Sequence, residues 1–248
     1  MNPIAPTRNS LFGRDNERAA IRQKLSARQP FLLHGPAGIG KSSLLRTLLD
    51  DFPGLLYTAD TKSPQSLFRA LGDVLIHAGD GTAKALLKHA PVSSKSAISL
   101  KGIVLDSLRA SSYCVVLDQL IRPSQALASA VREMMAASAS VVSVARSAHM
   151  EDAGYILPLY PYREERFEVL PFDSRVAAAF ASSIADRLGI TAGNREEFLA
   201  RVLEYGKGNP GVILALLRKG SEPKYRTGNH IKIAPLYIDF RLEWNALA

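Results

Sequence analysis

The sequence predicts an α/β fold in which a parallel sheet is covered by helices on both faces, followed by a small helical domain. Two observations lead to this prediction. Short apolar, β-prone runs alternate with amphipathic segments along residues 30–172, which is the order expected when helices join the strands of a parallel sheet. After Pro171 the β-prone runs give way to helix-capping residues followed by helical patterns.

The same patterns place the individual elements. The expected strands are 30–35, 54–60, 112–118, 140–146 and 166–172. The expected helices of the first domain are 43–49, 64–78, 98–109 and 123–137. Three further helices are expected to begin after Asp173, after Asn194, and at Asn209 or Pro210. We therefore predict an α/β domain at 1–171, a helical domain at 172–220 and a segment at 221–248 that is strand-like over Ile231–Phe240.

Composition and charge limit the classes of function. The 248 residues are 47% hydrophobic and 22% charged, with a formal net charge of +8, as in a soluble globular protein. Residues 1–150 hold 18 Lys and Arg against 10 Asp and Glu, whereas residues 151–248 hold 13 of each. This excess suits a bound nucleotide or a nucleic acid. No apolar run approaches the ~18–20 residues that span a bilayer, so we expect a cytoplasmic protein with no membrane partner.

One motif has a specific chemical meaning. The stretch "FLLHGPAGIGKSSLL" has the spacing G-x-x-x-x-G-K-S, preceded by a strand pattern and followed by a helix pattern, which is typical of a phosphate-binding P-loop. Glycines let the loop amides point inward at an anion. The lysine supplies a cation to the outer phosphates, and the serine hydroxyl can ligate Mg²⁺. The predicted nucleotide-binding residues here are Gly35, Pro36, Ala37, Gly38, Ile39, Gly40, Lys41, Ser42 and Ser43.

A P-loop site needs a second metal-side residue, an acid at the end of another buried strand. Asp118 fits this role because the four residues before it are apolar and β-prone. Asp60 also ends a strand pattern and is the alternative, with a weaker apolar run. We therefore predict a P-loop NTPase with Ser42 and Asp118 as its metal-side residues.

Four motifs, in order, resemble the AAA+/STAND branch of P-loop ATPases, particularly archaeal-type and origin-recognition-like ATPases. They are "LFGRDNERAAI", the P-loop, "YCVVLD" and a strand ending "VARS", and the later "KGNPGVILALL" resembles the start of the family's lid helix. The resemblance covers roughly residues 11–218 and implies that residues 172–220 form a helical lid domain. It also implies that Phe12, Gly13 and Arg14 contact the base or ribose, that Arg146 senses the γ-phosphate and that Pro210 packs near the adenine.

Structural explanations for these residues stay open. Phe12 can act as a hydrophobic staple for a helix that begins near Asp15, Arg146 can be a solvated residue at a strand end, and Gly208–Pro210 can be an ordinary helix stop and restart. The sequence also departs from the family pattern, because Gln119 stands where a catalytic glutamate is expected after Asp118.

Gln119 leaves three outcomes open. An amide can orient a water molecule but cannot take its proton near neutral pH. Hydrolysis can be slow and stimulated by a partner, another carboxylate such as Asp60 can act, or ATP can be held without turnover. The predicted catalytic residues are Lys41, Gln119 and Arg146.

We expect a protein that binds ATP (or ADP) with Mg²⁺ and acts as a slow or partner-stimulated ATPase, either as a nucleotide-dependent switch or as a subunit of a larger assembly. Its partners would be another protein or further copies of itself. One alternative is a nucleic-acid-associated ATPase of the transposition or replication-loader type, suggested by the positive charge and by the basic stretch Arg218, Lys219, Lys224, Arg226 and Lys232. The other is an ATP-binding scaffold that does not hydrolyse.

Overall fold

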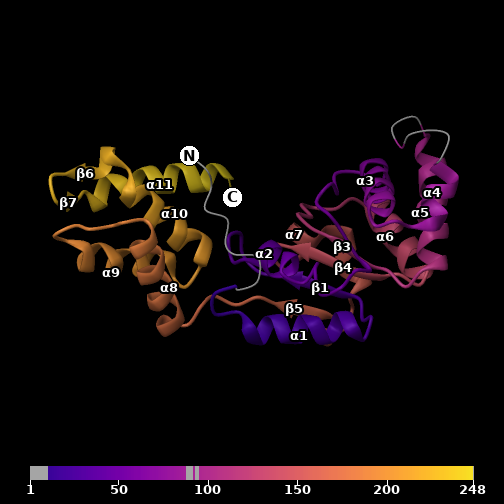
Figure 1. The fold of residues 1–248 in the computed structure, drawn as a ribbon, viewed down its shortest axis with the longest axis horizontal. Helices are drawn as coiled ribbons and strands as arrows, with labels where there is room; N and C mark the ends of the chain where they lie inside the picture. The colour runs from indigo at the N-terminus through magenta and orange to yellow at the C-terminus, as the bar shows by residue number, and fades with distance from the viewer. Residues whose placement is uncertain (1–10, 88–91, 93–94, 248) are drawn as a thin grey trace. The chain divides into compact units, whose positions relative to one another are not determined.

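A five-stranded parallel sheet organises the first part of the chain (Figure 1). The structure is a computed structural model and describes residues 11–87, 92 and 95–247. It divides into two units, the first comprising the chain through Pro36 together with Lys41–Val169, and the second comprising Ala37–Gly40 and the chain from Leu170 onward. The strands of the sheet are β1 (Phe31–His34), β2 (Leu55–Thr58), β3 (Cys114–Leu117), β4 (Ser140–Ala145) and β5 (Arg166–Glu168).

The strand order is β2-β3-β4-β1-β5, so β4 lies between β1 and β3. All four pairings are parallel. Strands β3 and β4 are buried along their whole length, which agrees with the continuous apolar runs that predicted a sheet covered on both faces. Because the strands are parallel, the loops after β1, β3 and β4 all leave from the same edge of the sheet.

Helices cover both faces of this sheet. Side chains on one face, such as Leu32, Leu56 and Val115, join a core with the helices that connect β2 to β3 and β3 to β4. The opposite face meets the first helix, since the Cys114 thiol lies 3.9 Å from the Leu25 carbonyl. The helical elements of the unit are α1 (Asp15–Ser26), α2 (Lys41–Arg46), α3 (Pro64–His77), α4 (Gly81–Leu87), α5 (Ala97–Ala110), α6 (Gln125–Ala136), α7 (Met150–Ala153), η2 (Gly154–Leu159) and η3 (Arg163–Glu165).

The second unit has a helical core of its own. Two of its helices begin as the sequence predicted: the Asp173 carboxylate accepts from the Val176 N–H at 2.8 Å, and Asn209 caps the next, with Pro210 as the first helical residue. The elements are α8 (Ser174–Arg187), α9 (Arg195–Gly206), α10 (Pro210–Ser221), η4 (Pro223–Tyr225), β6 (Arg226–Thr227), β7 (His230–Ile231) and α11 (Ile233–Leu247).

Helix α9 begins directly after Asn194, as expected, but the Asn194 side chain makes no capping hydrogen bond. It pairs instead with the Ile231 backbone, accepting from the N–H at 2.9 Å and donating to the carbonyl at 3.0 Å. One expectation for this unit was wrong. The segment Ile231–Phe240 is mostly helical, since α11 begins at Ile233. Leu236 and Phe240 are buried and Trp244 is half-buried, so the apolar residues that pack follow a four-residue spacing rather than a two-residue one.

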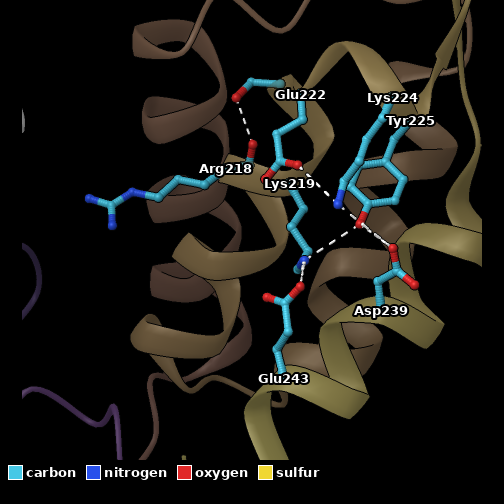
Figure 2. A network of polar contacts seen from close by, with 8 residues as sticks. Arg218, Lys219, Glu222, Lys224, Tyr225, Asp239 and Glu243 are labelled. Atoms are coloured by element: carbon cyan, nitrogen blue, oxygen red, sulfur yellow. Dashed lines mark hydrogen bonds and ion pairs between the residues drawn. The ribbon is translucent and has the colours of Figure 1, made fainter. Parts of the chain in front are cut away.

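A network of polar contacts joins α10, η4 and α11 (Figure 2). Lys219, which is only 7% exposed, donates to Glu243 at 2.7 Å. The Tyr225 hydroxyl donates to Asp239 at 2.6 Å, and the Lys224 ammonium lies 4.6 Å from the centre of the Tyr225 ring. The network holds the C-terminal helix on the rest of the unit. Among the helices of the described ranges, none combines the length and hydrophobicity needed to traverse a lipid bilayer.

Close packing in the second unit leads to a stability prediction. A Cβ atom at Gly220 would lie 2.3 Å from the tip of the buried Phe198 ring, so Gly220→Ala should destabilise the protein by about 1–3 kcal/mol through overpacking. Gly102 is the matched control, because it is also helical and a Cβ atom there would meet no atom within 4 Å beyond its chain neighbours and the backbone of its own helix. Gly102→Ala should be neutral or stabilising by up to ~1 kcal/mol. Urea unfolding of both variants checks this, and equal stabilities would contradict the packing.

Candidate nucleotide-binding site

The P-loop lies between the end of β1 and the start of α2. Its three glycines have positive φ angles, 148° at Gly35, 78° at Gly38 and 104° at Gly40. Residues with a Cβ rarely adopt such angles, which explains why the spacing requires glycine. Glycine therefore stands at each of the three positions where the loop backbone takes a positive φ.

Lys41 folds back over the loop. Its ammonium donates to the carbonyls of Gly35 at 2.5 Å and Pro36 at 3.1 Å. Burial lowers the pKa of Lys41 to about 8, with the Arg146 charge acting in the same direction and Asp118 and Asp152 opposing it. A partly desolvated ammonium is stabilised by a nearby anion, so a phosphate beside Lys41 would favour its charged form.

Asp118 follows β3 and is buried, with 1% exposure. One carboxylate oxygen accepts from the Gln119 N–H at 2.8 Å, and the other accepts from the Tyr57 hydroxyl. Burial and the hydrogen bond to Asp118 raise the pKa of Tyr57 to about 12, so its hydroxyl stays protonated and acts as a donor. Asp60, the alternative acid, follows the edge strand β2 and is exposed.

Gln119 has a left-handed backbone conformation, with φ of 57°, and an exposed side chain. Positive φ is uncommon for a residue with a Cβ. The turn is braced by the buried Thr61, whose hydroxyl donates to the carbonyls of Asp118 at 3.3 Å and Gln119 at 3.4 Å. The Leu120 N–H then donates to the Val144 carbonyl at 3.1 Å, which returns the chain to the sheet.

Arg146 follows β4, between the P-loop strand and the Asp118 strand. Its carbonyl accepts from the Gly35 N–H at 3.2 Å, and its charge contributes to lowering the pKa of Lys41. The structure thus brings Gly35, Lys41, Asp118 and Arg146 to one edge of the sheet. A role in sensing the γ-phosphate stays a prediction.

The remaining predicted contacts lie at the ends of helices. Phe12, Gly13 and Arg14 directly precede α1; Phe12 is 40% exposed, whereas Arg14 is buried and paired with Glu17. Pro210 belongs to the second unit, which also contains the middle of the P-loop, Ala37–Gly40.

Within that second unit, the start of α10 contacts the middle of the P-loop. The Asn209 side chain donates to the Ala37 carbonyl at 2.8 Å, and the Gly211 N–H donates to the Gly38 carbonyl at 2.9 Å. Asn209 also caps α10 by accepting from Gly211 and Val212. The Gly-Asn-Pro motif therefore has a structural role as a cap. Contact of Pro210 with adenine stays a prediction.

Sequence reasoning missed three residues near the predicted site: Tyr57, Thr61 and Asp152. Tyr57 and Thr61 contact Asp118 directly. Asp152 accepts from Ser147 at 2.6 Å and raises the pKa of Lys41. Only Tyr57 had a usable signal, since it stands in a strand pattern that ends at the alternative acid Asp60.

The residues present suit a magnesium ion carried by a nucleotide. The Ser42 hydroxyl and the Asp118 carboxylate are oxygen ligands of the kind that Mg²⁺ prefers, and Mg²⁺ normally takes only one or two protein groups when it binds with phosphates. In the part of the chain that the structure describes, no cluster of three or more His, Cys, Asp or Glu side chains could hold a metal. The donor set therefore fits a metal that arrives with its nucleotide.

A family model described as an AAA ATPase domain matches residues 10–153, which include the P-loop, β3 and β4. The chain belongs to this AAA ATPase family. The predicted P-loop ATPase class is thereby confirmed. No match was found among curated proteins.

Solved structures with a similar fold include a Walker-type ATPase, an ORC1 protein and a Cdc6 protein. A Walker-type ATPase of Pyrococcus abyssi superposes with a TM-score of 0.68 at 15% identity, covering 99% of this AAA ATPase and 77% of that chain. The ORC1 protein of Aeropyrum pernix, in complex with DNA, gives 0.66 at 15% identity, covering 95% and 66%. Cdc6p from Pyrobaculum aerophilum gives 0.58 at 14% identity, covering 89% and 64%. At these identities the likeness shows the fold alone.

The two candidate acids differ enough to be separated by mutation. If Asp118 is the metal-side carboxylate, Asp118→Asn should weaken Mg²⁺-dependent ATP binding by about 10-fold or more. Asp60→Asn is the matched control and should change it by less than about twofold, as expected for an exposed residue. Titration of a fluorescent ATP analogue at fixed Mg²⁺ measures both, with a parallel titration in EDTA. A larger loss in Asp60→Asn would assign the metal to the other acid.

Proposed function

We propose that this AAA ATPase binds ATP together with Mg²⁺ and hydrolyses it slowly, or only when a partner stimulates it, as a nucleotide-dependent switch or a subunit of a larger assembly. The observation that carries the proposal is the convergence of Gly35, Lys41 and the buried Asp118 carboxylate at one edge of the sheet. A STAND-type subgroup and a cytoplasmic location, both inferred from the sequence, belong to the same proposal.

Each residue would have a distinct task. The loop amides and Lys41 would hold the β- and γ-phosphates. Ser42 and Asp118 would hold the metal, and the metal would supply charge neutralisation for phosphoryl transfer. Arg146 would register the γ-phosphate, and Phe12, Gly13, Arg14 and Pro210 would contact the base or ribose.

The slow rate in this proposal rests on Gln119. Gln119 follows the proposed metal-side acid in the sequence, and its side chain is exposed. The amide can orient a water molecule through its carbonyl oxygen, but it cannot remove the proton from that water. A glutamine in this task supports hydrolysis on the order of 10⁻⁴ s⁻¹ in some GTPases until a partner supplies an arginine. The protein partner would be another subunit of the assembly or a further copy of this chain.

A nucleic-acid-associated ATPase is the alternative function. Two sequence observations suggested it, the net positive charge and the C-terminal basic stretch, and the structure weakens the second. Lys219 and Lys224 are paired with acidic side chains, and Arg226 donates to the Gly220 and Thr191 carbonyls, although only at 3.4 Å each (Figure 2 shows the lysine pairs). The carboxylates beside Lys219 and Lys224 offset part of the charge that the C-terminal basic stretch offers to a phosphate backbone. The net charge of +8 and the ORC1 neighbour solved with DNA are what still favour this alternative.

Turnover measurements test the proposal. Wild type should bind ATP·Mg²⁺ and turn it over slowly, while Gln119→Glu should raise the rate by about 10²-fold, because a carboxylate can act as a general base. Lys41→Ala should abolish binding. Lys101→Ala is the control for Lys41→Ala, because Lys101 is a surface residue paired with Glu133 on a neighbouring helix, and it should leave both binding and turnover unchanged.

Three results would lead elsewhere. Binding that survives Lys41→Ala would point to a scaffold in which the P-loop is unused. Fast turnover by wild type that Asp60→Ala removes would move catalysis to that carboxylate. A rate that rises steeply with duplex DNA at low salt, and falls as salt is added, would favour the nucleic-acid-associated alternative.

A further inference from the structure

Tyr57 is the least expected residue beside the metal-side acid. In the pairing of β2 with β3, Tyr57 lies opposite Val116. Side chains alternate between the two faces of a strand, so Asp118, two residues beyond Val116, projects on the same face as Tyr57. That is the face opposite the one formed by Leu56 and Val115. The register of two neighbouring strands thus brings a phenol and a carboxylate together.

Each oxygen of the Asp118 carboxylate accepts a hydrogen bond. The Gln119 N–H donates to Oδ1 at 2.8 Å, and the Tyr57 hydroxyl donates to Oδ2. The Tyr57 ring is positioned in turn by Arg46, whose guanidinium lies 5.4 Å from the ring centre. Arg46 is the last residue of α2, the helix that begins at Lys41. A chain of contacts therefore links the P-loop helix to the carboxylate.

We propose that Tyr57 is a positioning residue whose hydroxyl holds the Asp118 carboxylate in the orientation that receives the Mg²⁺ of bound ATP. The inference rests on the proposed function, since it concerns the same metal. Tyr57 contacts Asp118 and acts through it.

The chemistry of the carboxylate permits both partners at once. An ionised carboxylate has about four lone-pair positions, so one hydrogen bond on each oxygen leaves room for a metal or a metal-bound water. Groups that orient a metal-binding side chain typically contribute 10–100-fold to metal affinity. Without the hydroxyl, Oδ2 would lose its donor and the buried carboxylate would be restrained at Oδ1 alone.

Tyr57→Phe tests this positioning, because it removes the hydroxyl and keeps the ring beside Arg46. The matched control is Tyr113→Phe. The Tyr113 hydroxyl also donates to a carboxylate, that of Asp80, at 3.0 Å, but Tyr113 precedes β3, at the end of the strand remote from Asp118. Both variants lose one tyrosine–aspartate hydrogen bond, and only one of these lies beside the predicted metal.

The measurement is the binding of a fluorescent ATP analogue as Mg²⁺ is titrated, with a second series in EDTA. Tyr57→Phe should need about 10-fold more Mg²⁺ for half-maximal tightening, while its affinity in EDTA stays at the wild-type value. Tyr113→Phe should match wild type in both series. A general loss of folding would weaken the EDTA series as well, so this readout separates positioning from a merely structural role.

The outcomes distinguish the inference from the function on which it rests. If wild type binds the nucleotide with no response to Mg²⁺, the proposed function fails. If wild type responds to Mg²⁺ and Tyr57→Phe responds at the same concentration or a lower one, the function stands and the positioning role is overturned. A response of Tyr57→Phe at a lower Mg²⁺ concentration than wild type would mean that the hydroxyl competes with the metal for the carboxylate.

Discussion

The pairing of β4 between β1 and β3 is the constraint on which the candidate site depends. Because β4 is hydrogen-bonded in parallel to both neighbours, the chain segments after the three strands emerge together at the carboxyl edge of the sheet. Two further backbone bonds join these segments to β4 and to the residue after it, from Leu120 to the Val144 carbonyl and from Gly35 to the Arg146 carbonyl. Gly35, Asp118 and Arg146 come from separate parts of the sequence, and only this pairing brings them to one place.

The site also holds charges in an environment that penalises them. Burial depresses the pKa of Lys41, and Asp118 is almost fully enclosed. A buried charge is costly unless partners stabilise it. Tyr57 and the Gln119 N–H stabilise the carboxylate, and the carbonyls of the P-loop receive the ammonium. These contacts orient both groups towards the edge of the sheet where a phosphate and its metal would bind.

The second unit shows why charge counted along a sequence is a weak guide to a binding surface. Lys219 and Lys224 read as part of a basic stretch, but the fold places them beside Glu243, Glu222 and Asp239. Both lysines contact Tyr225, Lys219 through the hydroxyl and Lys224 over the ring, so they lie where α10, η4 and α11 meet. The basic side chains available to a ligand are those that remain after such internal ion pairs are subtracted.

Local sequence determined the P-loop, the buried strand that ends in Asp118, and the caps at Asp173 and Asn209, because each depends on residues a few positions apart. The α/β class followed for the same reason, from alternating short patterns. Helix α11 could not be predicted, because its apolar run is compatible with the period of a helix or of a strand. The packing of Leu236 and Phe240 in the helical core is what decides for a helix. Likewise only the register of β2 on β3 places Tyr57 beside Asp118, because that pairing brings together a hydroxyl and a carboxylate that are 61 positions apart in the sequence.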